Sequence, residues 1–375
     1  MKIAIGCDPN ATEMKNTIKA YVESLGHECT DFGSDDPIYA NTAIALAEAV
    51  AAKKYDRGIL ICGTGIGVAI AANKVKGAYA ATVNNCYQAQ RAELSNHANI
   101  ITMGSQVTGI EVAKMMVKEY LSHTFDPNSR SAPKIERIYE YELLRLELTA
   151  SRCRRNILRM IEAGHHGHFG GSFSSIDIAT ALYFYKMNID PANPKMEHRD
   201  RFLLSAGHKC MTQYAVLAER GYFDKAVLDT YGSLGTKLPG HPDMYKLPGV
   251  EANTGALGHG LSIATGMALG LRGTGAKVYA IMGDGELAEG SNWEAAAAAA
   301  HHKVDNVTAF LDNNGLQISG RVTDVMSMEP IAEKFRAFGW AVREIDGNDM
   351  RQIVDALDSL PFEAGKPSMV VAHTV

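Results

Sequence analysis

The sequence predicts an α/β protein made of two doubly wound parallel-sheet, Rossmann-like domains, residues 1–140 and 141–375, joined by a helix. Three observations predict this fold class. Short β-branched or apolar runs alternate with helical patterns in both parts of the chain, which is typical of parallel sheets. A helical pattern without Gly or Pro runs from Lys134 to Ala163, between the two parts. The 375 residues are also enough for two or three hydrophobic cores.

The first domain is expected to contain strands that alternate with helices. A further helix is predicted from Thr108 to Leu121, and Pro and Ser breakers predict a loop from His123 to Pro133. The predicted strands are Lys2–Cys7, Cys29–Phe32, Arg57–Cys62, Ala78–Thr82 and Asn99–Met103.

The second domain repeats this pattern with more glycine-rich turns. In an open parallel sheet, ligands bind beyond the carboxyl ends of the strands, so the turns that follow the strands are the candidate sites. The predicted strands are Arg201–Ser205, Lys277–Met282, Val307–Leu311, Trp340–Ile345 and Ser368–Ala372.

Composition excludes several classes of protein. Hydrophobic residues make up 46% and charged residues 21%, as in an ordinary globular protein. The net charge is -5 and no basic tract occurs, so the sequence gives no electrostatic indication of binding to nucleic acid or anionic lipid. No apolar stretch is long enough to span a bilayer, and the first residues, MKIAIG, predict a strand and not a signal peptide. Six cysteines without a CxxC pair fit free thiols, so a cytoplasmic protein is expected.

A glycine-rich segment, ICGTGIGVAIAANK at Ile61–Lys74, is the most informative part of the first domain. Its backbone N–H groups can converge on an anion at the start of a helix. A dinucleotide site would need an acidic residue about 20 positions further on, and Val83–Asn85 offers none. Cys62 ends the preceding strand, where a thiolate would be stabilised, although a buried inert cysteine is the commoner outcome. The glycines are Gly63, Gly65 and Gly67.

Together with GCD at Gly6–Asp8 and SNHANIITMGSQ at Ser95–Gln106, this segment makes residues 1–140 resemble the ribose-5-phosphate isomerase B and galactose-6-phosphate isomerase family. The resemblance implies aldose–ketose isomerisation of a sugar phosphate without a cofactor. Cys62 would be the base, Thr64 would assist proton transfer at oxygen, and Asp8 would be a further catalytic residue. The implied anion-binding groups are the amides of Gly63, Gly65 and Gly67 with Asn96 for the enediolate, and Arg130 and Lys134 for the phosphate.

The sequence departs from this family at three positions. Pro9 stands where a phosphate-binding His is usual, Ser95 where a ring-opening His is frequent, and Lys134 where an Arg is expected. His97 is a candidate substitute for the ring-opening group or a solvent-facing residue. A tetrose 4-phosphate cannot close a furanose ring because its O4 is esterified. The departures therefore raise a four-carbon sugar phosphate as an alternative substrate.

Two motifs follow neighbouring predicted strands of the second domain. GDGELAEG begins at Gly283 and LDNNGL begins at Leu311, with 27 residues between GDG and NN. Asp284 and Asn314 supply the hard oxygen ligands that Mg²⁺ prefers. The pair of motifs at this spacing is similar to the thiamine diphosphate signature, whereas either motif alone would read as a polar turn. The histidines of this part lie in separate turns without metal-ligand spacing.

Residues from about 145 to 375 resemble the amino-terminal, cofactor-diphosphate half of transketolase. The segments that carry the resemblance are HGHFGGSFSSIDI at His166–Ile178, DRFLLSAGHK at Asp200–Lys209, LPGHPD at Leu238–Asp243 and NTGALGHGLSIATGMA at Asn253–Ala268. The resemblance implies thiamine diphosphate with Mg²⁺ or Ca²⁺. The implied roles are metal binding by Asp284, Asn314 and the carbonyl of Leu316; cofactor binding by His208, Gly255, Leu257, Gly258, Gly285 and Asn314; a substrate channel at His168 and His241; and an interface at Glu289.

The pyrimidine-binding half of transketolase, which carries the glutamate that activates the thiazolium, has no counterpart in this sequence. We therefore expect a homodimeric fusion of a sugar-phosphate isomerase with a transketolase amino-terminal part, and a pyrimidine-binding half on a separate chain. Truncation of a longer product would explain the same gap. The competing class is a scaffold or binding protein in which one or both sites are degenerate.

Overall fold

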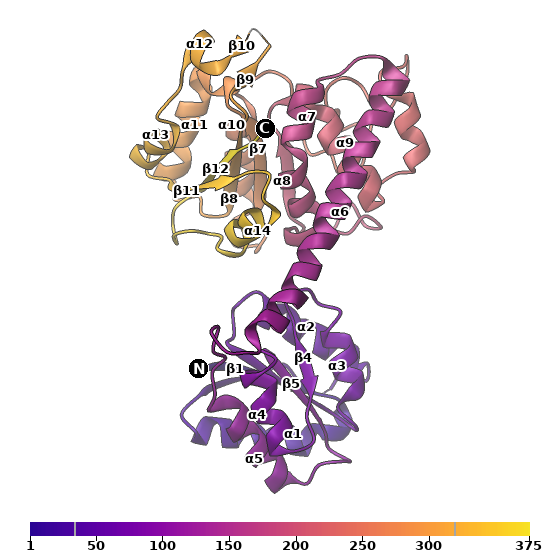
Figure 1. The fold of residues 1–375 in the computed structure, drawn as a ribbon, viewed down its shortest axis with the longest axis vertical. Coiled ribbons are helices and arrows are strands. Elements are labelled where there is room, and N and C mark those ends of the chain that lie inside the picture. Colours follow the sequence, from indigo (N-terminus) through magenta and orange to yellow (C-terminus); the bar gives the residue numbers. More distant parts are fainter. Residues whose placement is uncertain (34, 319) are drawn as a thin grey trace. The chain divides into compact units, whose positions relative to one another are not determined.

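The computed structural model describes residues 1–33, 35–318 and 320–375, and it divides into two compact units, Met1–Glu140 and Tyr141–Val375. Figure 1 labels the elements of each unit. The long helix α6, Ala132–Gly164, contributes its first residues to the first unit and the remainder to the second.

The first unit is built on a parallel sheet with the strand order β2-β1-β3-β5-β4. The chain passes from β1 to β2 in one direction and then returns to place β3 on the other side of β1, so the topological switch point lies between β1 and β3. The strands are β1 (Lys2–Cys7), β2 (Glu28–Asp31), β3 (Arg57–Cys62), β4 (Ala80–Thr82) and β5 (Ile100–Gly104).

Helices cover both faces of this sheet. Ile3 and Ile5 of β1 face one helix layer and Ala4 faces the other, which is why inner strands such as β1 and β3 are continuous apolar runs. One layer is α1 (Thr12–Ser24), α4 (Cys86–Leu94) and α5 (Ile110–Leu121); the other is α2 (Tyr39–Ala51) and α3 (Ile66–Ala72). A short 3-10 turn, Pro9–Ala11, precedes α1.

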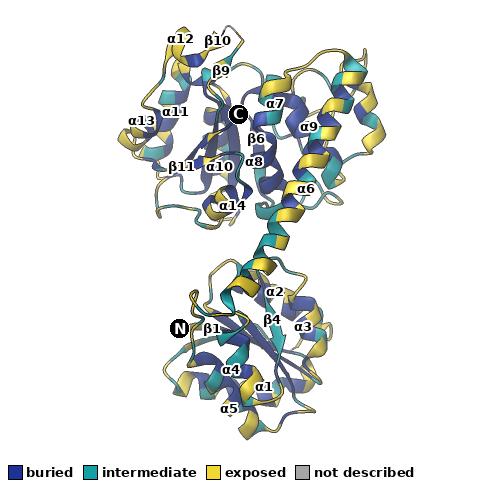
Figure 2. Ribbon diagram, viewed as in Figure 1, coloured by how far each residue is buried: buried dark blue, intermediate teal, exposed yellow. Residues whose placement is uncertain are grey.

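The second unit has a parallel sheet with the order β11-β12-β8-β7-β6. Its strands are β6 (Arg201–Leu204), β7 (Val278–Gly283), β8 (Val307–Asn313), β11 (Ala341–Asp346) and β12 (Ser368–His373). The strands β7, β8 and β12 are almost wholly buried, whereas the edge strand β11 is partly exposed (Figure 2).

Two hydrophobic clusters lie on opposite faces of this second sheet. The first includes α6, α8 (Ile176–Ala181), α9 (Cys210–Arg220) and α14 (Met350–Asp358); the second includes α10 (Gly260–Gly270), α11 (Gly290–His301) and α13 (Ile331–Ala337). The shorter elements are α7 (Phe169–Ser174), η2 (Leu182–Lys186), η3 (Gly207–Lys209), η4 (Lys225–Thr230), η5 (Gly285–Ala288), β9 (Leu316–Gln317), β10 (Gly320–Arg321) and α12 (Val322–Met326).

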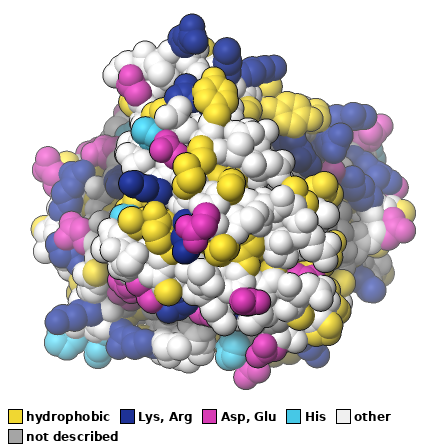
Figure 3. Space-filling view, turned by 90° about the horizontal axis from the view of Figure 1, so that it is seen from below, with side chains coloured by type: hydrophobic (Ala, Val, Ile, Leu, Met, Phe, Trp, Pro, Cys, Tyr) yellow, Lys and Arg dark blue, Asp and Glu magenta, His cyan; other side chains and the backbone are white. Residues whose placement is uncertain are grey.

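The predicted fold class is confirmed, with two parallel sheets sandwiched between helices. In the described part of the chain, no helix is long and apolar enough to cross a membrane. On the face drawn in Figure 3, basic and acidic side chains are interspersed and do not form one basic area. All six cysteines are free thiols.

A buried ion pair fixes the chain that follows α5. Arg57 and Glu93 are 7% and 4% exposed, and their charged atoms lie 3.1 Å apart. The Arg57 guanidinium also donates to the carbonyls of Tyr120 and His123, and Glu93 accepts from the Phe125 N–H at 2.9 Å. One ion pair therefore holds the end of α5 and the start of the following loop.

We expect Arg57→Met to lower the free energy of unfolding of the first unit by about 3–5 kcal/mol, because Glu93 is left buried and uncompensated. Arg137→Met is the matched control: its partner Glu140 is exposed, and its loss should cost less than about 1 kcal/mol. The measurement is denaturant unfolding of both variants. Equal effects would contradict the structural role given to the buried pair.

Candidate functional site

The predicted metal ligands of the second unit lie together at the carboxyl ends of β7 and β8. Asp284 follows β7, and its two oxygens accept from the Gly285 N–H at 2.8 Å and the Gly315 N–H at 2.6 Å. The Asn314 side chain accepts from the Leu316 N–H at 3.0 Å. Because Gly315 lies in the loop after β8, the Asp284 carboxylate joins the two motif loops directly.

The Asp284 carboxyl lies in a largely buried environment. Burial raises the pKa of Asp284, an effect that the Gly285 and Gly315 N–H groups and the Lys209 charge oppose. No cluster of three His, Cys, Asp or Glu side chains with metal-binding geometry occurs in the described residues. The predicted set of one carboxylate, one amide oxygen and one carbonyl lies outside that class and suits Mg²⁺ or Ca²⁺.

Three histidines gather near these loops. The rings of His168 and His208 meet edge to face, with centroids 4.7 Å apart. Burial, helped by the nearby charges of His168, Lys209 and His241, lowers the pKa of His208 to about 4. The His241 ring lies against Gly255, where a Cβ would stand 2.6 Å from its Cδ2. His208 is therefore a neutral imidazole at physiological pH, able to donate one hydrogen bond and accept another.

Glycines let the backbone segments around His208 approach one another closely. A Cβ on Gly207 would stand 2.6 Å from the carbonyl carbon of Thr254, and one on Gly258 would stand 2.5 Å from the Cβ of Glu289. The Thr254 hydroxyl is buried without a hydrogen-bond partner among the described residues. Tight glycine turns, an unused buried hydroxyl and hard oxygen donors fit a diphosphate held through a divalent cation.

Other members of the predicted set lie on the same loops. The carbonyl of Leu257 lies 3.2 Å from Nδ1 of His259, and a Cβ on Gly285 would stand 2.8 Å from Oε1 of Gln317. Glu289 is exposed and packs against Gly258.

Glu286 is a site residue that the sequence analysis missed. Its carboxylate accepts from the Gly258 N–H at 2.8 Å, the Gly283 N–H at 3.2 Å and the Ser205 hydroxyl. Burial raises its pKa. Glu286 thereby ties the loop before α10 to the end of β7. Gly260 lies against Ser205, where a Cβ would be 2.2 Å from the hydroxyl oxygen.

A second missed feature is the buried pair of Lys209 and Asp312, whose charged atoms are 2.5 Å apart. Asp312 also accepts from the hydroxyl of Ser174 at 2.7 Å and from that of Thr374 at 2.5 Å. Ser174 in turn accepts from the Asn314 amide at 3.3 Å. The pair is therefore linked through one hydroxyl to a predicted metal ligand.

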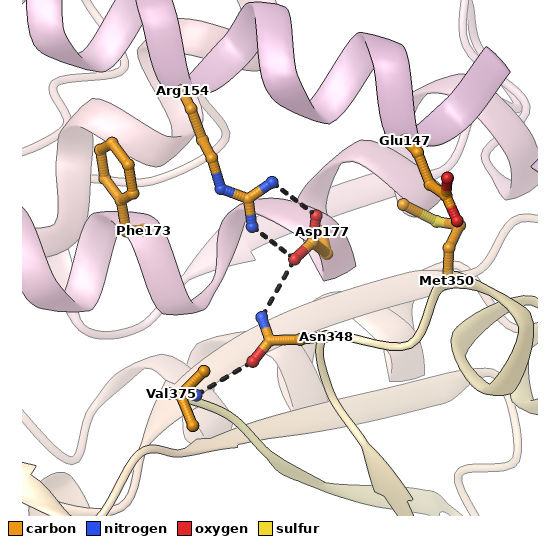
Figure 4. Close-up of a pocket in the computed structure, with 7 residues that line it drawn as sticks. All are labelled: Glu147, Arg154, Phe173, Asp177, Asn348, Met350 and Val375. Carbon is orange, nitrogen blue, oxygen red and sulfur yellow. Dashed lines mark hydrogen bonds and ion pairs between the residues drawn. The ribbon is translucent and has the colours of Figure 1, made fainter. Parts of the chain in front are cut away.

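Figure 4 shows a separate pocket of about 380 Å³ in the second unit. Arg154 donates two hydrogen bonds to Asp177, at 3.0 and 2.6 Å, and Asn348 donates a third at 3.0 Å. The Asn348 oxygen accepts from the Val375 N–H at 3.0 Å. Since these groups satisfy one another, we assign this pocket a structural role that joins α6, α8 and the segments that follow β11 and β12.

In the first unit, Asp8 and Cys62 flank the topological switch point. Asp8 follows β1 and donates its N–H to the Ile61 carbonyl at 2.9 Å, while Cys62 ends β3. The Cys62 thiol is 6% exposed and accepts from the Gly65 N–H at 3.1 Å. Gly65 has a φ of +82°, and a Cβ there would stand 2.8 Å from the Met103 backbone, so only glycine fits.

The other residues discussed for this site make few hydrogen bonds. The Thr64 hydroxyl accepts weakly from the Ile66 N–H at 3.4 Å, while Gly63 adjoins Gln106 and Gly67 adjoins the ring of Tyr39. The hydroxyl of Ser95 accepts from Arg91 at 3.4 Å. Pro9 begins the 3-10 turn after Asp8.

Four predicted or alternative residues of this unit make no hydrogen bond or ion pair to Asp8 or Cys62 among the described residues. Asn96, Arg130 and Lys134 are exposed, and no hydrogen bond or ion pair of the described residues joins them to Asp8 or Cys62. The ring of His97 stacks on that of Phe125, with centroids 4.6 Å apart, and its Nδ1 lies 3.0 Å from the Tyr139 hydroxyl. Both contacts lie beside a largely apolar pocket of about 740 Å³. The structure thus groups Asp8, Cys62 and the glycine loop, but not the basic residues.

The fold and site of the second unit define a thiamine diphosphate-binding domain of the transketolase type. Residues 147–375 match the family model described as "Transketolase, thiamine diphosphate binding domain", and the chain belongs to this family. Residues 3–138 match the model described as "Ribose/Galactose Isomerase". The chain therefore joins members of two families that handle sugars, as the resemblances in the sequence indicate.

The relatives of the second unit include shorter proteins that are named as transketolase subunits. The chain is 42% identical over 231 residues to a subunit of the apulose-4-phosphate transketolase of Phocaeicola vulgatus, covering 61% of this chain and 82% of that protein. It is 44% identical over 211 residues to the 6-deoxy-6-sulfo-D-fructose transketolase subunit SqwG of a Clostridium species, covering 56% and 77%. The transketolase of Leishmania mexicana is 30% identical with a TM-score of 0.58, over 61% of this chain and 36% of that one.

We expect the stability of the second unit to fall as the pH is lowered from about 6.5 to about 4, in part because of His208. In the unfolded chain this histidine takes up a proton near its ordinary pKa, whereas the folded pKa is about 4. The unfolded state therefore binds more protons within this window. His208→Gln should lose part of the slope of unfolding free energy against pH, and the exposed-site control His198→Gln should keep it. Identical slopes for wild type and His208→Gln would argue against the lowered pKa.

Proposed function

We propose that the second unit is the cofactor-diphosphate-binding subunit of a two-subunit transketolase. The observation that carries this proposal is the convergence of Asp284 and Asn314 at the ends of adjacent parallel strands. Membership of the thiamine diphosphate-binding family supports it, and so do relatives that are named as transketolase subunits.

The residues of the site have three tasks in this proposal, and His208 takes part in two of them. Asp284, Asn314 and the carbonyl of Leu316 hold a divalent cation, preferably Mg²⁺. His208 and the backbone of Gly255, Leu257, Gly258 and Gly285 hold the diphosphate. Thiamine diphosphate supplies the nucleophilic thiazolium carbon needed for ketol transfer when it is bound. The neutral imidazole of His208, with His168 and His241, forms hydrogen bonds to the hydroxyl groups of the sugar.

A partner subunit completes the enzyme in this proposal. The partner supplies the pyrimidine-binding half and the glutamate that activates the cofactor, and the exposed Glu289 lies at the contact with it. The names of the relatives as transketolase subunits support a division of the activity between two chains.

We expect the purified chain to bind Mg²⁺ and thiamine diphosphate weakly and to show no ketol transfer until a pyrimidine-binding subunit is added. Asp284→Ala should abolish cofactor binding, because the carboxylate is the charged ligand of the cation. Asp355→Ala, at an exposed position, is the control. Calorimetric titration and a coupled ketol-transfer assay are the measurements. Ketol transfer by the chain alone would overturn the division into two subunits.

For the first unit, we propose isomerisation of an aldose phosphate to a ketose phosphate. Cys62 removes a proton from the carbon beside the carbonyl and returns it to the neighbouring carbon. Thr64 assists the proton transfer between oxygens, with Asp8 as a further catalytic group. The N–H that Gly65 donates to the Cys62 sulfur supports this role, because a donor at sulfur stabilises the thiolate.

Replacement of the proposed base is the direct test. Cys62→Ala should reduce isomerisation by at least about 10²-fold, the range of general acid–base catalysis, without loss of the folded state. Cys86→Ala, at a half-buried free thiol of the same unit, should retain activity. Turnover is measured with ribose 5-phosphate and erythrose 4-phosphate. An active Cys62→Ala variant excludes this thiol as the base.

The natural substrate is proposed to be a four- or five-carbon sugar phosphate. Position 95 is a serine and therefore supplies no ring-opening imidazole. Its hydroxyl accepts a hydrogen bond from Arg91. A tetrose 4-phosphate needs no ring opening, and we expect kcat/KM to be higher for erythrose 4-phosphate than for ribose 5-phosphate. A preference for ribose 5-phosphate would reject the four-carbon substrate and leave the isomerase proposal intact. If neither unit is active with its substrates and partner, a binding or scaffold role replaces both proposals.

A further inference from the structure

Lys209 occupies an unusual place for a lysine, between the carboxyl ends of β7 and β8. The residue is 3% exposed, and its ammonium lies 2.5 Å from Asp312 at the end of β8. It is also 3.5 Å from where a Cβ of Gly283, at the end of β7, would stand. Its aliphatic stem lies against Gly171, where a Cβ would be 2.8 Å from Cε. The ammonium is thus held between the two loops that carry Asp284 and Asn314.

The hydrogen-bonding capacity of this ammonium is only partly used. A lysine ammonium has three donors, and in the described part of the chain Lys209 gives one, to Asp312. Asp312 also accepts from Ser174 and Thr374, so it is satisfied by three donors. Buried donors without an acceptor cost free energy, and this cost is removed when a ligand or water accepts from them.

The charge of Lys209 reaches the cofactor loops. It lowers the pKa of both Asp284 and Glu286, opposing the effect of burial on these carboxyls. His208, the residue before Lys209, is proposed to hold the diphosphate. A diphosphate carries more negative charge than one divalent cation neutralises, and a lysine ammonium is a compact point charge that binds phosphate well.

We propose that the Lys209 ammonium donates directly to an anionic oxygen of the cofactor diphosphate, with a donor that Asp312 does not use. This inference rests on the proposed cofactor site. It adds a cationic side chain, from η3, to a diphosphate site whose other proposed groups are the neutral His208 and backbone segments.

The alternative is that Lys209 only neutralises Asp312, and paired variants separate the two roles. Lys209→Met alone leaves Asp312 buried and unpaired, so its instability would be uninformative. The double variant Lys209→Met with Asp312→Asn removes both charges, so that no unpaired charge is left buried. The single variant Asp312→Asn keeps the ammonium and frees it from its competing carboxylate.

The experiment titrates the full chain with thiamine diphosphate and Mg²⁺, followed by ³¹P NMR and calorimetry, with thiamine as the probe without phosphate. The double variant should bind thiamine diphosphate about 10- to 100-fold more weakly than wild type, the range expected for a hydrogen bond between charged groups. Its midpoint of thermal unfolding should stay close to that of wild type. Asp312→Asn should bind at least as tightly as wild type, and binding of thiamine should be equal in all three proteins.

Wild-type affinity in the double variant would overturn the inference, because Lys209 would then serve only Asp312. Weaker binding by Asp312→Asn would overturn it as well, and this result does not require the double variant to fold. The cofactor site itself is tested by Asp284→Ala in the same titration. Loss of binding in Asp284→Ala, with none in the double variant, would reject the role of Lys209 and leave the proposed function standing. Absence of binding by wild type would reject both.

Discussion

A fully buried carboxylate, Asp312, is the interaction on which the architecture of the second site depends. It is the penultimate residue of the central strand β8, and the sheet register places it beside Gly283 of β7 and Ala372 of β12. A charge at this depth is tolerated only if donors surround it. Those donors come from Lys209, Ser174 and Thr374, which belong to segments far apart in the sequence. Neutralising one charge therefore draws three segments to the end of the sheet.

The two units meet the same geometric requirement in different ways. Both place the side chains of their proposed sites where parallel strands end. The first unit uses the switch point between β1 and β3, where one strand ends at Cys62 and the other is followed by Asp8. The second unit uses the ends of the adjacent strands β7 and β8. Buried polar side chains such as Glu286 hold the loops at these ends through hydrogen bonds.

The strands could be predicted because buried parallel strands are continuous apolar runs, and their ends differ from prediction by only one or two residues. β8 extends to Asn313 because β12 pairs with it there, which the sequence alone does not specify. The two-residue strands β9 and β10 carry no periodicity and were not predicted. Asp284 and Asn314 were recognisable because glycine-rich motifs surround them. Glu286 lies inside GDGELAEG and Lys209 ends the segment DRFLLSAGHK, but the identity of a charged residue does not reveal that its side chain is buried.

Two glycines of α10 differ in whether a larger residue can replace them. At the start of the helix, Gly260 leaves no room for a methyl group beside Ser205, so this turn cannot be redesigned without disturbing the clamp on Glu286. Gly266, in the exposed middle of the same helix, has open space around it. Alanine at such a position restricts the unfolded chain and suits the helical backbone, typically for about 0.4–1 kcal/mol. A stabilising substitution can therefore be made at Gly266, whereas Gly260 at the start of the same helix must be kept as glycine.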